Sequence, residues 1–526
     1  MDSEARINVL FASSEVAPLA KTGGLGDVSF ELPKTLANMG VDIRIVMPAY
    51  HDTLDLIQKK YKHTATKTIH LRKGAKPISL IETTLPQTNI TLWLVNAAGF
   101  SDRHGGPYSD PQGVIWPDNA QRFGLFCDAI TAIALGHNAL DWQPDIVHCN
   151  DWHTGLVPAQ LSLHEDTPAT VFTVHNISYQ GLFSYETFLN LGLDHSLWRF
   201  DALEFHNQLS FIKGGLMFAD WVNTVSPQYA KELTRPEFGH GLDDVFCFRK
   251  KSFNGISNGI DLNEWNPATD PTIKQKFSAH SLEKKKNNTC DLQKKFNLAQ
   301  DSSCCVLGWV GRLTEQKGVD SLLNNLANII KLPIQLILLG SGDKQYEQAL
   351  SVWSKRYPEK IAVQIGYDEI HAHQIIAGAH FFLMPSVFEP CGLTQMYSQR
   401  YGAIPIARRV GGLVDTVVNI NASTLSKRSA TGIVYKGSGK NSLLLAIKSA
   451  IKLKKNTTDY QAVQVNAMGK DFSWQHSAQQ YIDIYRKIDR SKRGGNPPKN
   501  HGTNIAAPVN RPRLKSSRAE FACSSG

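Results

Sequence analysis

Residues 7–27 read INVLFASSEVAPLAKTGGLGD, and this stretch predicts a β-strand, a glycine-containing loop and the start of a helix. The run from Ile7 to Ser13 has the length and apolar character of a buried strand. An apolar pattern with helical spacing begins at Val28. Because a strand that leads into a helix is the first half of a βαβ unit, the stretch predicts an α/β fold built on a parallel sheet.

Short apolar runs alternate with helical patterns along most of the 526 residues. The first half of the chain holds candidate strands at 7–13, 43–48, 90–95, 146–150, 170–174 and 221–225. The pattern restarts in the second half, at 306–310, 335–339, 361–365, 380–384 and 404–407. Two such sets predict two Rossmann-like domains, and the length agrees, because one hydrophobic core rarely grows beyond about 250 to 300 residues.

The boundary between the two domains is expected after the turn at residues 257–261, because a polar segment that contains prolines follows it. We therefore assign 1–260 to an N-terminal domain and 261–473 to a C-terminal domain. A helix over about 474–490 is expected to pack back on the N-terminal domain. The composition of 491–526, rich in Gly, Pro, Ser and Arg, predicts a disordered basic tail.

The net charge of +9 lies mostly at the end of the chain, where residues 490–526 carry eight basic residues and one acidic residue. The body is therefore near neutral, which argues against nucleic acid as a partner. No apolar run is long enough to span a membrane, and the N-terminus lacks the pattern of a signal peptide. The eight cysteines form no C-x-x-C pair. These features predict a cytoplasmic protein with reduced thiols and no membrane partner.

The loop that contains Lys21, Gly23 and Gly24 precedes the first predicted helix. Glycines at a helix N-terminus let backbone N–H groups approach an anion, so a phosphate site is one interpretation. The dinucleotide pattern G-x-G-x-x-G and the P-loop pattern are both missing from this loop. A tight turn with no ligand is the alternative.

Polar residues follow two other predicted strands, with Asp151 after 146–150 and His175 and Asn176 after 170–174. If these strands are neighbours, the three side chains meet at the carboxyl edge of the sheet, where open α/β folds bind ligands. His148, Asp151 and His153 also invite a zinc interpretation, but no further cluster completes a recognisable zinc spacing. Hydrogen-bonding or packing roles are favoured, and no metal is expected.

In the second half, the strand at 306–310 leads into a loop with Arg312 and Lys317, two cations that suit a diphosphate. An exposed basic loop is the simpler alternative. No D-x-D triplet occurs in the chain, so the usual carboxylate pair that holds a metal against a sugar nucleotide is missing. Fixed cations would then have to stabilise the negative charge of the departing diphosphate.

Residues 385–394 read PSVFEPCGLT and are predicted to form a strand end, a turn and a helix start. The N–H groups of Gly392, Leu393 and Thr394 are placed to bind a diphosphate at that helix N-terminus. Glu389 stands just before them. A carboxylate at such a site needs a positive or hydrogen-bonding partner, so its presence favours a functional role over accident.

Together, these segments resemble the bacterial glycogen synthases and plant starch synthases, which are retaining glycosyltransferases of family 5. The resemblance covers about residues 7–488 and implies the GT-B architecture, in which two Rossmann-like domains face a central cleft. Five motifs carry it in the expected order: Lys21-Thr-Gly-Gly-Leu25, Asp151-Trp-His153, Thr173-Val-His-Asn176 with Tyr179-Gln-Gly181, Gly311-Arg-Leu-Thr-Glu-Gln-Lys-Gly318 and Phe388-Glu-Pro-Cys-Gly-Leu-Thr-Gln395.

The resemblance implies transfer of glucose from ADP-glucose to the 4-hydroxyl at the non-reducing end of an α-1,4-glucan such as glycogen. The anomeric configuration would be retained, and no metal or other cofactor would be required. The residues that match the family's catalytic positions are Asp151, His175, Arg312, Lys317 and Glu389. Those that match positions around the donor are Lys21, Gly23, Gly24, Tyr108, Asn176, Cys391, Gly392, Leu393 and Thr394.

Several alternatives stay open at this point. The same fold serves phosphorylases and nucleotide-sugar epimerases, although a glucan phosphorylase would have a longer chain and a pyridoxal lysine. A glucan-binding scaffold without activity is a different class. The donor base and the choice between front-face attack and a covalent intermediate are not decided by the residues.

Overall fold

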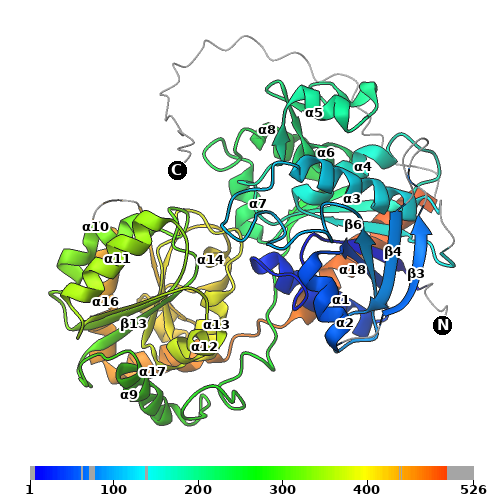
Figure 1. Cartoon of the computed structure of the whole chain (residues 1–526). Helices are drawn as coiled ribbons and strands as arrows, with labels where there is room; N and C mark the ends of the chain where they lie inside the picture. Colours follow the sequence, from blue (N-terminus) through cyan, green and yellow to red (C-terminus); the bar gives the residue numbers. More distant parts are fainter. Residues whose placement is uncertain are drawn as a thin grey trace, which may run out of the picture.

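Two mainly parallel sheets, one in each half of the chain, organise the molecule (Figure 1). The computed structural model describes residues 6–60, 63–69, 71, 78–136, 140–437, 439 and 441–493. Every strand range predicted above coincides with an observed strand, and the α/β fold with two Rossmann-like domains is confirmed.

The N-terminal sheet has nine strands in the order β12-β11-β7-β6-β1-β2-β5-β4-β3. All neighbours are parallel except β3 with β4 and β4 with β5. The strands are β1 Asn8–Ala12, β2 Asp42–Pro48, β3 His63–Ile69, β4 Ile78–Thr84, β5 Thr91–Asn96, β6 Ile146–Asn150, β7 Ala169–Val174, β11 Trp221–Thr224 and β12 Phe253–Gly255. A small sheet in the same domain joins β8 Leu182–Phe183, β10 Gln208–Ser210 and β9 Glu204–Phe205.

The C-terminal sheet has six parallel strands in the order β15-β14-β13-β16-β17-β18. Its central strands are apolar throughout, because helices cover both faces. The strands are β13 Cys305–Val310, β14 Ile334–Gly340, β15 Ile361–Ile365, β16 Phe381–Met384, β17 Ile404–Arg408 and β18 Ile433–Tyr435.

The helices follow the strands as expected for βαβ units. The N-terminal domain contains α1 Gly24–Asn38, α2 His51–Lys60, α3 Asn119–Ala134, α4 Leu156–Leu161, α5 Tyr185–Asn190, α6 Phe211–Phe218, α7 Pro227–Leu233 and α8 Asp243–Phe248. The C-terminal domain contains α9 Lys285–Lys295, α10 Val319–Ile329, α11 Lys344–Arg356, α12 Glu369–Gly378, α13 Thr394–Arg400, α14 Gly411–Thr416, α15 Ala422–Ser426, α16 Ser442–Lys455 and α17 Thr457–Met468.

The last helix, α18 Trp474–Arg493, returns to the N-terminal domain, where Figure 1 shows it in orange beside the blue elements. Its apolar side joins the core of that domain through Trp474 and Tyr485. The Tyr485 hydroxyl lies 2.7 Å from Nδ1 of His148, on β6. The helix runs past the boundary expected at 490, and the rest of the expected tail, 494–526, lies outside the described residues.

In the part of the chain that the structure describes, no helix is both long and apolar enough to cross a membrane.

Two short helices cap each other across the domain boundary. Both carboxylate oxygens of Glu232, on α7, accept a hydrogen bond from the Gly411 N–H at the start of α14, each at 3.0 Å. In return, the Asp415 carboxylate on α14 accepts hydrogen bonds from the Gln228 N–H, at 3.1 Å, and from the Ser226 hydroxyl. Each carboxylate satisfies amide donors that a helix start leaves without intrahelical partners, so the two domains stabilise each other.

Replacing Glu232 with alanine is therefore expected to destabilise the protein. Glu232 is buried, and its loss leaves the Gly411 N–H without its acceptor, at a cost of about 1–3 kcal/mol. The measurement is the midpoint of urea unfolding, and Glu232→Gln, which keeps one acceptor oxygen, should recover part of the loss. Glu283→Ala, at an exposed site, is the matched control. Equal midpoints for Glu232→Ala and this control would contradict the role of the cap.

Candidate active site

The predicted polar side chains of the N-terminal domain do meet at one edge of the sheet. Strands β6 and β7 are parallel neighbours, with Asn150 opposite Thr173, so Asp151 and His175 leave the sheet side by side. Nε2 of His175 lies 3.0 Å from the Asn150 side-chain oxygen. Asn176 forms a local turn, in which its side-chain oxygen accepts the Ser178 N–H at 3.1 Å.

Asp151 is held in an unusual state at this edge. Its backbone has φ of 60° and ψ of 179°, a conformation that costs energy for a residue other than glycine. Its carboxyl group is buried and accepts the Trp152 N–H at 3.0 Å. Burial, with a smaller contribution from the nearby charge of Glu15, raises the pKa of Asp151 to about 8. The group is therefore largely protonated at neutral pH.

The histidines of the site are neutral for the same reason. Burial lowers the pKa of both His175 and His148 to about 3, and it holds the pKa of His153 well below its ordinary value. His148 is held between Tyr485 and Thr173, and the His153 ring stacks on Tyr108 with 4.7 Å between ring centroids. Hydrogen bonds hold both ring nitrogens of His148, whereas ring packing holds His153, whose buried Nδ1 has no hydrogen-bond partner among the described residues.

Glu15 is a site residue that the sequence analysis missed. Its buried carboxylate accepts hydrogen bonds from the Thr22 N–H at 2.5 Å, the Thr22 hydroxyl at 2.6 Å and the Gly23 N–H at 3.2 Å. The Tyr108 hydroxyl donates to it as well, at 2.6 Å. Glu15 lies three residues after the end of β1, whereas Asp151 follows the end of β6 directly. No sequence motif marked Glu15, because its partners are set by how the loop around Thr22 folds.

Two backbone amides of the glycine loop have a partner within the protein. The N–H groups of Thr22 and Gly23 donate to the Glu15 carboxylate, and α1, which begins at Gly24, has no side-chain cap in the described part of the chain. The cation of the loop is Lys21, which pairs with Asp27 at 2.7 Å while two fifths of its side chain stays exposed. A side-chain carbon at Gly24 would lie 3.6 Å from Leu393, so the loop lies against the C-terminal domain.

Glu389 has the positive partner that its position demanded. Nζ of Lys317 lies 2.9 and 2.8 Å from its two carboxylate oxygens, and the Ser386 hydroxyl donates to the same group at 2.9 Å. Glu389 is buried, whereas about a quarter of the Lys317 side chain is exposed. The predicted diphosphate lysine and the predicted catalytic glutamate are thus joined in one ion pair.

Arg312 faces the other domain. Its Nη1 donates a hydrogen bond to the Tyr179 hydroxyl at 3.2 Å, and Tyr179 follows β7 in the N-terminal domain. The loop that begins after β13 therefore brings a cation to the boundary between the two domains.

The turn before α13 presents a helix start with no side-chain cap. It contains buried Cys391, Gly392 with φ of 70°, Leu393 and Thr394. Burial raises the pKa of the Cys391 thiol to about 12, so this group stays protonated. The φ of 70° at Gly392 lies in the left-handed region that favours glycine, and a side chain there would also displace the Gln395 side-chain oxygen, 2.4 Å away. The uncapped amides match the predicted anion position.

A cavity of about 490 Å³ opens at Trp152, the residue that follows Asp151 in the chain. Half of the residues that line it are aromatic: Trp152, Tyr179, Phe205 and His240. Flat apolar walls with polar edges suit the faces of a sugar ring, and Tyr179 links this cavity to Arg312.

Comparisons with known proteins agree with this geometry. The family described as "Starch synthase catalytic domain" matches residues 8–247, and "Glycosyl transferases group 1" matches residues 304–437. Glycogen synthase 1 of Methylococcus capsulatus is 49% identical over 481 residues, which cover 91% of this chain and 96% of that protein. Glycogen synthase of Cellvibrio japonicus is 46% identical over 482 residues, which cover 91% and 99%.

Solved structures give the same result. The catalytic domain of starch synthase IV from Arabidopsis thaliana, bound to ADP and acarbose, superimposes with a TM-score of 0.82 at 31% identity. It covers 92% of this chain and 99% of its own. A sucrose-phosphate synthase from Thermosynechococcus elongatus shares the fold, with a TM-score of 0.56 at 17% identity and coverage of 92% and 99%.

The raised pKa of Asp151 predicts a pH dependence of stability. Its ordinary pKa is about 4 and its pKa in the folded chain is about 8, so folding favours the protonated form. Its contribution to the free energy of unfolding is therefore fully present below pH 4 and is lost as the pH rises towards 8. Urea unfolding between pH 4 and 9 measures this.

Asp151→Asn, which mimics the protonated acid, should remove that part of the pH dependence, whereas Asp244→Asn on the exposed start of α8 should leave it. If the free energy of unfolding changes with pH in the same way in the wild type and in Asp151→Asn, Asp151 titrates at its ordinary pKa and the prediction is wrong.

Proposed function

The chain belongs to the family of bacterial glycogen synthases and plant starch synthases and is a glucosyltransferase, and on this premise we propose that it transfers glucose from ADP-glucose to an α-1,4-glucan. The acceptor is the 4-hydroxyl at the non-reducing end, and the anomeric configuration is retained. The observation that carries the proposal is the Lys317–Glu389 pair beside the uncapped start of α13.

The charges around this pair support the proposed donor. As the bond between glucose and ADP breaks, negative charge develops on the diphosphate and positive charge on the sugar ring. Arg312, Lys317 and the amides at the start of α13 supply fixed positive charge for the diphosphate. Lys21, on the opposite domain, adds a further cation for the nucleotide side of the donor.

Glu389 is the carboxylate proposed to stabilise the sugar. In this structure, Lys317 neutralises it. A bound diphosphate competes for Lys317, and the charge on Glu389 then becomes available to the positive sugar. The His175 side chain is a neutral imidazole, because burial lowers its pKa to about 3. Its ring, together with the His175 backbone carbonyl, can therefore orient the glucose only through hydrogen bonds.

The acceptor is proposed to lie in the cavity lined by Trp152 and Tyr179. Trp152 and Tyr179 offer flat faces to successive glucose units, and Tyr179 places this wall next to Arg312. Because Asp151 has a pKa of about 8, it can donate a hydrogen bond to a sugar hydroxyl at neutral pH.

We also propose that transfer needs no metal ion or other cofactor, since fixed cations occupy the positions where the diphosphate is expected. Location in the cytoplasm stays a prediction, and fractionation of cells that express the protein would test it.

The decisive experiment measures incorporation of labelled glucose into glycogen from ADP-glucose and, in parallel, from UDP-glucose. The buffer contains a chelator and no added metal. Rapid incorporation from ADP-glucose is expected. Faster incorporation from UDP-glucose would overturn the proposed donor, and loss of activity on chelation would overturn metal independence. Glycogen binding without turnover from either donor would identify a scaffold.

The roles of Lys317 and Glu389 predict selective loss of turnover. Removing either charge from the transition state should lower kcat by about 100-fold or more in Lys317→Ala and in Glu389→Ala. Lys344→Ala is the matched control, because the Lys344 side chain is 88% exposed on α11. Circular dichroism checks that each variant folds. Near-normal kcat in a folded Lys317→Ala or Glu389→Ala variant would show that the site is assigned wrongly.

A further inference from the structure

A second cluster of ligand-type side chains lies at the domain boundary, outside the residues used above. Glu369 and His373 stand four residues apart on α12, so both point to one face of that helix. Glu264, from the segment that connects the two sheets, completes the cluster. One ligand atom from each of the three residues lies within 4.8 Å of the others.

His373 is fixed in the manner of a metal-binding histidine. It is buried at 5% exposure, and its Nδ1 lies 2.8 Å from the Asp270 carboxylate. The same oxygen of Asp270 accepts the Tyr401 hydroxyl at 2.6 Å, and the His373 ring stacks on Trp265 with 3.9 Å between centroids. A carboxylate behind one ring nitrogen orients the imidazole and leaves Nε2 to bind an ion.

We propose that Glu264, Glu369 and His373 form a binding site for a divalent transition-metal cation, for which Zn²⁺ is the best match. One imidazole nitrogen with two carboxylate oxygens suits Zn²⁺, whereas Ca²⁺ and Mg²⁺ prefer ligand sets made only of oxygen. Both carboxylates reach solvent, so an ion has a path of entry. Three protein ligands leave room for a water molecule in a tetrahedral shell.

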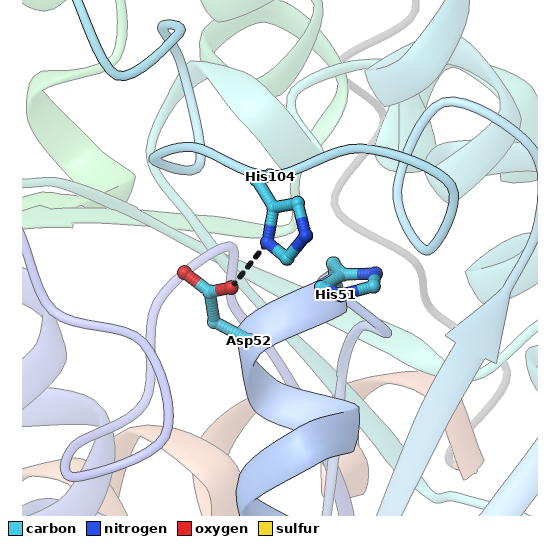
Figure 2. A group of neighbouring side chains, drawn as sticks. All are labelled: His51, Asp52 and His104. Carbon is cyan, nitrogen blue, oxygen red and sulfur yellow. Dashed lines mark hydrogen bonds and ion pairs between the residues drawn. The ribbon is translucent and has the colours of Figure 1, made fainter.

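A second possible cation group among the described residues is less well built (Figure 2). His51 and Asp52 lie at the start of α2, and His104 reaches them from a loop. The side chains of Asp52 and His104 are 67% and 71% exposed, and their closest atoms are 3.4 Å apart. Within the described residues, nothing buried holds the Asp52 and His104 side chains in place. This group therefore serves as the internal control.

An ion at the proposed site would act on the donor. Lys21 and Asp27 of the N-terminal domain lie within electrostatic range of Glu369. Zn²⁺ cancels negative charge there, so it makes the electrostatic potential around Lys21 more positive and should lower the KM for the anionic nucleotide sugar without a comparable change in kcat. This last step rests on the proposed function, whereas binding of the ion does not.

The test uses the full chain without an affinity tag, stripped of metal. Calorimetric titration with ZnCl₂ should give one site, and Co²⁺ should give the visible absorption bands of a tetrahedral site without a thiolate band. That band would indicate binding at the exposed Cys247 or Cys290 and would overturn the proposal. Glu264→Gln and Glu369→Gln remove single carboxylates that reach solvent, and each should weaken binding by about tenfold or more.

His104→Gln is the matched control and should leave Zn²⁺ affinity unchanged. Absence of binding to the wild type, or loss of binding in His104→Gln with affinity kept in Glu369→Gln, would overturn the proposal. Calorimetric titration and Co²⁺ absorption both measure metal binding and do not depend on turnover. If the proposed glucosyl transfer fails, these two measurements still test the metal site, so the two failures can be told apart.

Discussion

One hydrogen-bonded contact between the domains positions Glu389, the carboxylate proposed to stabilise the sugar. Glu232 of the N-terminal domain receives the Gly411 N–H, and the next N–H, that of Gly412, donates to the backbone oxygen of Glu389 at 3.0 Å. A side chain at Gly411 would collide with that same oxygen, so the glycine is required for the approach. The location of Glu389 in one domain therefore depends on a buried carboxylate in the other.

The sequence predicted the elements that end at the site, because parallel strands are buried on both faces and appear as continuous apolar runs. It also predicted that Asp151 and His175 meet, since the carboxyl ends of neighbouring strands share an edge. Strands β3 and β4 were missed, because in antiparallel strands with one exposed face polar residues interrupt the apolar run. The last helix was predicted to end at about 490, and α18 continues three residues further, to Arg493.

Contacts between distant residues were beyond the reach of sequence patterns. Lys317 and Glu389 were both assigned to the site, but nothing in their spacing indicates that they pair with each other. The same holds for Glu15, whose role exists only once the loop around Thr22 folds back on β1. Residue types and strand ends identify which groups gather at an edge, whereas the partner of each group depends on how the loops pack.

Burial leaves few charges in the proposed transfer site, and this gives each of them a large effect. Asp151 is largely protonated and His175 is neutral at pH 7, so neither screens the charge that develops in the reaction. The Lys317–Glu389 ion pair sits where water has limited access and charges interact strongly. A diphosphate that takes Lys317 would free the negative charge of Glu389 only once the donor is bound. On the proposed reaction, donor binding and stabilisation of the positive sugar would therefore be a single electrostatic event.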